Sequence, residues 1–277
     1  MAAYENVMTW DCVNCLGDTV GARFEDGYSV PATSLRWYLA SHDTLKAIVL
    51  AHMGTNPHNM ASFITDLMFF QAHWPVTVEG SGVHVGFLAS VNSGIQRAVD
   101  AVRAAAKRYP TYRIILTGHS LGAAQSVLAA VYLAAMLPDI KDRLEVCTFG
   151  QPRVGNQAFV EFYHGLNIST KRVVNQGDLV PHLPFVAWQY HHHGNEYWIR
   201  SSLGDTVRCD TEGSTEYPDC SQGVPSAKWS VAAHRHYWNA STAVPTLFFP
   251  PEPFPPYNSQ SPQLQEWMLP IEMERLV

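Results

Sequence analysis

Charged side chains are scarce in this chain of 277 residues. Asp, Glu, Lys and Arg make up only 15% of it, and 18 basic residues face 24 acidic ones. The formal net charge of −6 disfavours nucleic acids and anionic lipid surfaces, because both attract clusters of Lys and Arg. We therefore expect no nucleic-acid partner and favour a neutral one.

A long hydrophobic run is also missing. A membrane span needs roughly 18 uncharged apolar residues. The closest segment, Ala123 to Leu137, is interrupted by Gln125 and Ser126, so we expect a buried helix and no transmembrane segment. Residues 1–9 have neither the basic nor the apolar region of a signal peptide. That pattern fits a cytosolic protein or a secreted chain whose signal has been removed.

The five cysteines are an odd number, so one is left unpaired. Cys209 and Cys220 flank a polar, turn-rich loop, which favours a disulfide between them. Cys147 lies in an apolar run, which is typical of a buried free thiol. Cys12 and Cys15 form either a tight disulfide or half of a zinc site, but no second pair follows at zinc-finger spacing. We therefore expect no metal.

Two sequons for N-glycosylation are present, Asn167-Ile168-Ser169 and Asn239-Ala240-Ser241. Each is weak evidence by itself. Together with the cysteines they favour the secretory route, so we expect a secreted, extracellular glycoprotein.

Apolar runs alternate with helical patterns along most of the chain. The expected strands are 35–39, 46–52, 112–117, 144–149 and 171–175, and the expected helices are 87–107, 121–137 and 156–163. Strands that are apolar at every position are buried on both faces. The pattern predicts an α/β fold with a mostly parallel central sheet and helices on both faces. Residues 196–199 and 206–209 read as antiparallel extensions.

Proline sets the end of the chain apart. Six prolines lie between residues 245 and 256, and proline fits neither a helix interior nor a central strand. We therefore expect a single domain over residues 1–242 and a Pro-rich C-terminal arm over residues 243–277.

The strongest chemical signal is Gly118-His119-Ser120-Leu121-Gly122. It fits the G-x-S-x-G pattern, and an expected strand precedes it while an expected helix follows it. A nucleophilic serine needs such a tight turn so that its hydroxyl protrudes. The N-terminal N–H groups of the helix then point at the developing oxyanion.

A serine nucleophile also needs a base and an orienting carboxylate. Asp178 is well placed for the carboxylate, because it follows an expected strand with a glycine before it and a proline soon after. The base must come later in the chain, and spacing alone does not separate His234 from His236. The run 191–193 is all histidine, but neighbours on a strand point to opposite faces and rarely chelate one metal.

Three segments of this chain resemble the class 3 lipase family of secreted fungal triacylglycerol lipases and feruloyl esterases. They are 117–124 (TGHSLGAA), 148–156 (TFGQPRVGN) and 178–184 (DLVPHLP). The resemblance implies an α/β-hydrolase fold and a catalytic triad of Ser120, Asp178 and His234, without a cofactor. The family's His-x-x-Tyr pattern matches residues 234–237 and thereby selects His234 over His236.

The resemblance also implies an oxyanion hole. The family's usual Phe-Arg-Gly-Thr motif corresponds here to residues 52–55 (HMGT), so the N–H groups of Thr55 and Leu121 would bind the oxyanion. The usual arginine is replaced by Met53, which leaves open how the loop is supported. The region matching the family's lid is 56–64. There Met60, Phe63 and Ile64 are either lid residues that open at a lipid–water interface or ordinary core residues.

The function that follows is hydrolysis of carboxylic esters through a covalent acyl-enzyme. A triacylglycerol lipase acting on neutral glycerides is the leading interpretation, and a feruloyl or short-chain esterase is the alternative within the same chemistry. A non-catalytic lipid-binding relative is the alternative from another class.

Overall fold

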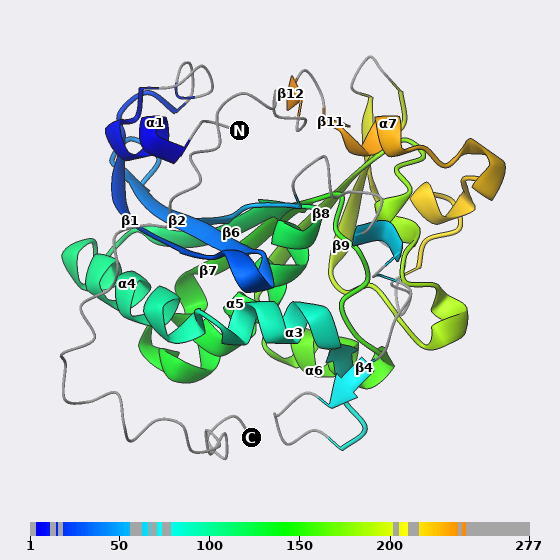
Figure 1. Ribbon diagram of the computed structural model, residues 1–277, viewed down its shortest axis with the longest axis horizontal. Coiled ribbons are helices and arrows are strands. Elements are labelled where there is room, and N and C mark those ends of the chain that lie inside the picture. The colour runs from blue at the N-terminus through cyan, green and yellow to red at the C-terminus, as the bar shows by residue number, and fades with distance from the viewer. Residues whose placement is uncertain are drawn as a thin grey trace.

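One eight-stranded sheet organises the molecule (Figure 1). The computed structural model describes residues 4–11, 15, 19–55, 63–65, 67, 71–73, 79–201, 205–209, 216–237 and 240–241. In spatial order the strands are β1 (Ala22–Val30), β2 (Leu35–His42), β3 (Ala47–His52), β6 (Arg113–His119), β7 (Leu144–Phe149), β8 (Ser169–Asn175), β9 (Asn195–Ile199) and β10 (Thr206–Cys209). Two small pairs stand apart: β4 (Gln71–His73) with β5 (Gly82–His84), and β11 (His236–Tyr237) with β12 (Ala240–Ser241).

The middle of the sheet is parallel and its edges are not. Strands β3, β6, β7, β8 and β9 run in one direction, whereas β1, β2 and β10 pair antiparallel with their neighbours. The expected antiparallel direction of 196–199 is therefore wrong, although that of 206–209 is confirmed. The long segment between β8 and β9 supplies the crossover that a parallel neighbour requires.

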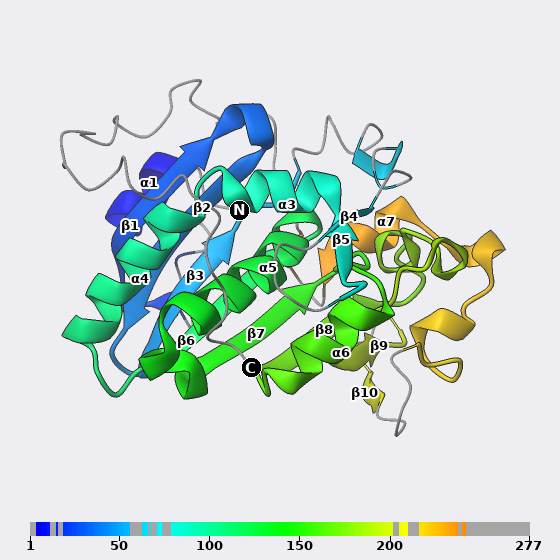
Figure 2. The same cartoon turned by 90° about the horizontal axis from the view of Figure 1, so that it is seen from below.

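The longer helices lie on one side of the sheet (Figures 1 and 2). These are α3 (Val85–Asn92), α4 (Ile95–Arg108), α5 (Leu121–Met136) and α6 (Gln157–Gly165), while the short α1 (Tyr4–Thr9) and α7 (Val231–His234) lie on the other side. The single helix expected over 87–107 is split at Gly94. A Cβ there would lie 2.5 Å from Leu35 and 2.9 Å from Tyr28, so only glycine allows this close packing. Short 3-10 turns complete the described elements: 31–33, 138–143, 180–182, 186–188, 221–223 and 226–228.

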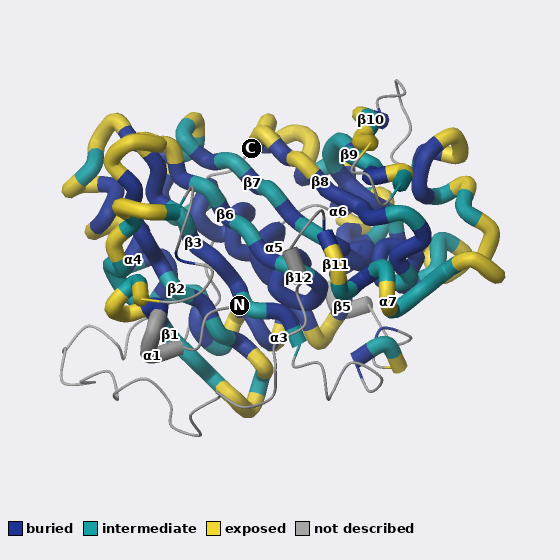
Figure 3. The backbone as a smooth tube through the Cα atoms, turned by 90° about the horizontal axis from the view of Figure 1, so that it is seen from above, coloured by how far each residue is buried: buried dark blue, intermediate teal, exposed yellow. Residues whose placement is uncertain are grey.

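Helix α5 forms the centre of the core, as the sequence predicts. Its residues from Leu121 to Ala134 are all buried (Figure 3), and they pack against both the sheet and the neighbouring helix α3. Its Ser126 donates to backbone carbonyls at 2.8 Å, and Gln125 Nε2 donates to Ser90 at 2.7 Å, whereas Gln125 Oε1 is buried without a partner among the described residues. Among the residues that the structure describes, no helix is long and apolar enough to cross a membrane.

The structure confirms part of what the sequence predicts for the cysteines. Cys209 and Cys220 form the expected disulfide. Cys15 is disulfide-bonded, so it is not a zinc ligand, and Cys12 lies outside the described residues. Cys147 is free but only partly buried, because it points to the face of β7 that alternates with the fully buried one. The Pro-rich arm expected over residues 243–277 also lies outside the described residues.

Candidate active site

Ser120 occupies a strained turn between β6 and α5. Its φ of +59° and ψ of −125° are a conformation that residues with a side chain rarely adopt. The turn is tight enough that a Cβ on Gly118 would lie 2.3 Å from the carbonyl oxygen of Gly122. The spacing of the two glycines around Ser120 is therefore a packing requirement of the turn itself.

Asp178 and His234 come together although 56 residues separate them. Asp178 Oδ2 lies 2.8 Å from His234 Nδ1, and both side chains are fully buried. The same oxygen accepts a hydrogen bond of 2.5 Å from Tyr237, and Oδ1 accepts one of 2.9 Å from the N–H of Val180. Burial alone raises the pKa of Asp178, but His234 and these donors outweigh it, so the pKa lies below its usual range. The carboxylate is therefore ionised at neutral pH.

The backbone brings Ser120 next to this pair. The N–H of Ser120 donates to the carbonyl of Phe149 at 3.0 Å. The next residue, Gly150, packs so tightly that a Cβ would lie 2.8 Å from both Asp178 Oδ2 and His234 Nδ1. Ser120 Oγ is buried and makes no hydrogen bond with a described residue. In free enzymes the hydrogen bond between a catalytic serine and its base is often long and tightens only when substrate binds.

His119 is a site neighbour that sequence reasoning missed. Its Nε2–H donates to the carbonyl of His234 at 2.8 Å, and the two rings lie 4.3 Å apart. Burial, helped by the proximity of His234, lowers the pKa of His119 to about 3. It is therefore a neutral donor that holds the backbone of His234.

Gly150 and Tyr237 were also missed as site residues. Gly150 follows β7 with a φ of +56°, and a glycine directly after a central strand was the available signal. The sequence identified Tyr237 only as the last position of the His-x-x-Tyr pattern and assigned it no role. In the structure it binds the carboxylate that orients His234.

The other candidate histidines lie elsewhere. His236 is exposed, and its Nδ1 bonds to the carbonyl of Ala232. His192 and His193 are buried, where they bond to the carbonyl of Pro181 and to Gln151 respectively. Among the described residues, the one group with metal-ligand geometry is Glu196 with Cys209 and Cys220, and its two sulfurs already form the disulfide.

The loop 52–55 is held from two sides without the family's arginine. The N–H of Met53 donates to the carbonyl of Arg36 on β2 at 2.8 Å. His52 Nδ1 lies 3.0 Å from Ser126 Oγ on α5. A Cβ on Gly122 would lie 2.4 Å from the carbonyl of His52. These contacts fix the loop against the helix that begins with Leu121.

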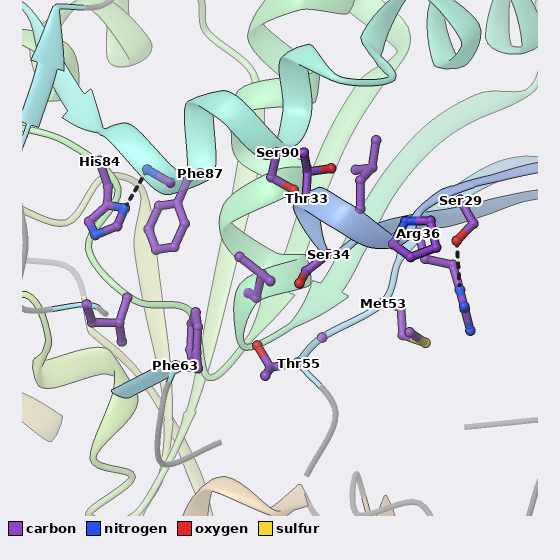
Figure 4. Close-up of a pocket in the computed structure, with 16 residues that line it drawn as sticks. Ser29, Thr33, Ser34, Arg36, Met53, Thr55, Phe63, His84, Phe87 and Ser90 are labelled. Carbon is purple, nitrogen blue, oxygen red and sulfur yellow. Dashed lines mark hydrogen bonds between the residues drawn. The ribbon is translucent and has the colours of Figure 1, made fainter. Parts of the chain in front are cut away.

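Thr55 and Leu121 line one cavity of about 650 Å³. Figure 4 shows Phe63, His84 and Phe87 at one end of it and Ser29, Arg36 and Met53 at the other. Thr55 Oγ1 is buried and has no hydrogen-bond partner among the described residues.

Two of the three lid candidates, Phe63 and Ile64, lie among the described residues. Phe63 is 8% exposed and lines the cavity as part of the core, and Ile64 packs against that core. Met60 lies outside the described residues.

A mostly parallel sheet, a serine on a strand–turn–helix and a buried His–Asp pair at the same edge define an α/β-hydrolase. The model of the family "Lipase (class 3)" matches residues 49–188. The chain belongs to this family.

Known relatives agree with this assignment. A lipase from Rhizopus niveus is 34% identical over 232 residues, which are 83% of this chain and 57% of the relative. A "secreted mono- and diacylglycerol lipase" from Fusarium solani is 36% identical over 169 residues, which are 60% of this chain and 48% of the relative. A solved triacylglycerol lipase, described as having a serine protease triad as its catalytic centre, superimposes with a TM-score of 0.76 at 34% identity. That alignment covers 84% of this chain and 86% of the solved one. The chain thus spans about half the length of these two curated relatives.

Proposed function

We propose that this protein is a serine ester hydrolase that acts as a lipase on neutral glycerides. The observation that carries the proposal is the buried pair of His234 and ionised Asp178 beside Ser120 in its strained turn. The apolar end of the cavity, with Phe63 and Phe87, suits a fatty acyl chain better than a small polar acid.

The chemistry proceeds through an acyl-enzyme. Ser120 Oγ attacks the ester carbonyl while His234 Nε2 takes its proton, and Asp178 stabilises the resulting imidazolium. The N–H groups of Thr55 and Leu121 bind the oxyanion of the tetrahedral intermediate, with the Thr55 hydroxyl as a third donor. His234 then gives the proton to the leaving alcohol. Water repeats the sequence on the acyl-enzyme, and no cofactor takes part.

Secretion and action at a lipid–water interface belong to the same proposal. Disulfide bonds are typical of secreted proteins, and this chain holds one between Cys209 and Cys220. Of the residues in the segment that matches the family's lid, Phe63 lines the cavity and Ile64 packs against the core. A jump in activity when substrate passes its solubility limit is the expected sign of a lid, and a smooth saturation curve would contradict it.

The test is hydrolysis of p-nitrophenyl esters from short to long acyl chains, with methyl ferulate alongside and Ser120→Ala as the control. We expect the highest kcat/KM on long chains and loss of activity in the variant. Activity confined to ferulate or short chains would overturn the substrate class while keeping the mechanism. Equal inactivity of both proteins would overturn the catalytic proposal.

A further inference from the structure

A second cavity of about 740 Å³ lies at the opposite end of β8 from the active site. It is lined by residues around the start of that strand, including Asn167, Ser169, Lys171 and Tyr197. Asp178 follows the other end of the same strand, about 20 Å away at the usual rise of roughly 3.3 Å per residue. A group bound in this cavity therefore leaves the entrance to the active site open.

The sequon Asn167-Ile168-Ser169 forms one wall of this cavity. Asn167 and Ser169 are exposed, whereas Ile168 is 8% exposed and packs into the core. Asn167 has a φ of +54°, and its N–H donates to the carbonyl of His164 at the end of α6. The buried isoleucine thus anchors an exposed turn with the acceptor amide at the surface, which is where N-linked sugars attach.

Helix termination explains only half of this motif. Asparagine is favoured in the left-handed conformation just after a helix, which accounts for Asn167. It does not account for a hydroxyl at Ser169. The neighbouring Thr170 is the residue whose hydroxyl bonds internally, at 2.8 Å to Tyr163 and at 3.0 Å to the carbonyl of Ile168.

The cavity lining suits a sugar. Its described residues offer amide, hydroxyl and amino groups, for example Gln157, Asn195 and Lys171, together with the partly exposed ring of Tyr197. None of the described lining residues is acidic. Hydrogen-bond donors therefore predominate in the lining. They suit a sugar, because its ring, hydroxyl and amide oxygens accept hydrogen bonds.

We propose that Asn167 carries an N-linked glycan whose first sugars lie in this cavity. A bond forms between Asn167 Nδ2 and the anomeric carbon of N-acetylglucosamine. The bond from that carbon to the diphosphate of a lipid-linked oligosaccharide donor breaks, and the amide proton leaves with the diphosphate. The proposal depends on entry into the secretory pathway and not on ester hydrolysis, so a catalytically dead protein would leave it intact.

The test is expression of the full chain in a eukaryotic secretory host, in an Asn239→Gln background that silences the second sequon. We expect peptide-N-glycosidase F to produce one downward shift in electrophoretic mass and to label position 167 with heavy oxygen from the water. Ser169→Ala and Asn167→Gly should abolish the shift, and Ser169→Thr should keep it, since threonine also completes a sequon. Asn167→Gly retains the left-handed turn, so its loss of the shift is not a folding effect. Absence of a shift in the Asn239→Gln protein, or its persistence in Asn167→Gly, would overturn the proposal.

A melting experiment tests the placement of the sugars in the cavity. Removing the glycan should lower Tm by about 2–4 °C, because the sugars would no longer pack against the cavity lining. The same enzyme treatment should not change Tm of Ser169→Ala. An unchanged Tm in the glycosylated protein would show that the sugars extend into solvent.

Discussion

Strand β9 has an ion pair at each end, and the two pairs lie in opposite environments. Arg172 and Glu196 are 0% and 4% exposed and lie 3.2 Å apart. Arg200 and Asp205 are 48% and 52% exposed and lie closer together, at 2.5 Å. Removing one partner of the closer pair should nevertheless cost less, because water screens an exposed pair and solvates the partner that remains, whereas a partner left alone in the interior is not solvated. Burial, rather than distance, therefore determines how much stability is lost when one partner of a pair is removed.

The buried pair joins β8 to β9 and binds further groups in the interior. Arg172 also donates to the carbonyl of His193, and Glu196 accepts from the N–H of Ser221. A second buried arginine, Arg153, binds Glu216 in the same region.

Arg153 connects this interior to the loop that carries Asp178. It donates to the carbonyls of His182 and Pro184, at 2.6 and 2.9 Å. A charged group in the interior thus holds the irregular backbone that follows Asp178.

The largest expected effect is on the buried pair. Arg172→Met should lower the free energy of unfolding by about 3–5 kcal/mol, because it leaves the carboxylate of Glu196 buried without its cation. Urea denaturation measures it. The double variant Arg172→Met/Glu196→Gln removes the stranded charge and should recover part of the loss. A loss below about 1 kcal/mol in Arg172→Met would contradict the contrast between the two pairs.

The next effect extends the comparison to glycines. Gly150→Ala should reduce kcat at least about 10-fold, because its Cβ would lie 2.8 Å from both His234 and Asp178 and misalignment near 1 Å is costly to catalysis. Gly21→Ala is the matched control, since Gly21 also has a positive φ, of +92°, but nothing lies within 4 Å of its Cβ position. Steady-state kinetics should show normal kcat in Gly21→Ala; equal losses in both variants would point to backbone strain alone.

Acid should lower the free energy of unfolding because a neutral histidine is buried in the folded state. Burial lowers the pKa of His52 to about 3, against about 6.5 in the unfolded chain. Stability is therefore complete above pH 6.5 and falls as pH decreases towards 3, because only the unfolded state takes up this proton. His52→Asn should make the slope of unfolding free energy between pH 6 and 4 shallower by about 1.4 kcal/mol per pH unit. Parallel slopes for the two proteins would refute this assignment.

The smallest effect belongs to the exposed pair. Arg200→Ala should cost about 0.2–1 kcal/mol, and added salt should reduce even that difference, because the pair is screened by solvent. Urea denaturation at low and high salt measures it. A cost comparable to that of Arg172→Met would reverse the comparison.

The fold was predictable where the signal is local in the sequence. The bounds of β7 and of the edge strand β10 agree with the sequence prediction. Strand β1 was missed because it is an edge strand with one fully buried residue. The split between α3 and α4 depends on a contact of Gly94 with distant residues, which no local pattern contains.

The residues of the site also differ in how far the sequence predicts them. Ser120 and Asp178 stand out because each follows a strand with glycine nearby. Spacing did not separate His234 from His236; only the family resemblance did, and in the structure His234 faces Asp178 while His236 is exposed. Gly150 and Tyr237 act through contacts across 28 and 59 residues of chain, so their roles become clear only in the three-dimensional structure.

The central claim is that His234 activates Ser120 as a nucleophile, and phosphonylation tests it most directly. A p-nitrophenyl alkylphosphonate should add one phosphonyl group per chain, located on Ser120 by peptide mass spectrometry. His234→Ala should slow this labelling by at least about 10²-fold, the lower range for a general base. His236→Ala should label at the normal rate. Labelling at another residue, or equal rates in His234→Ala and the original protein, would contradict the account.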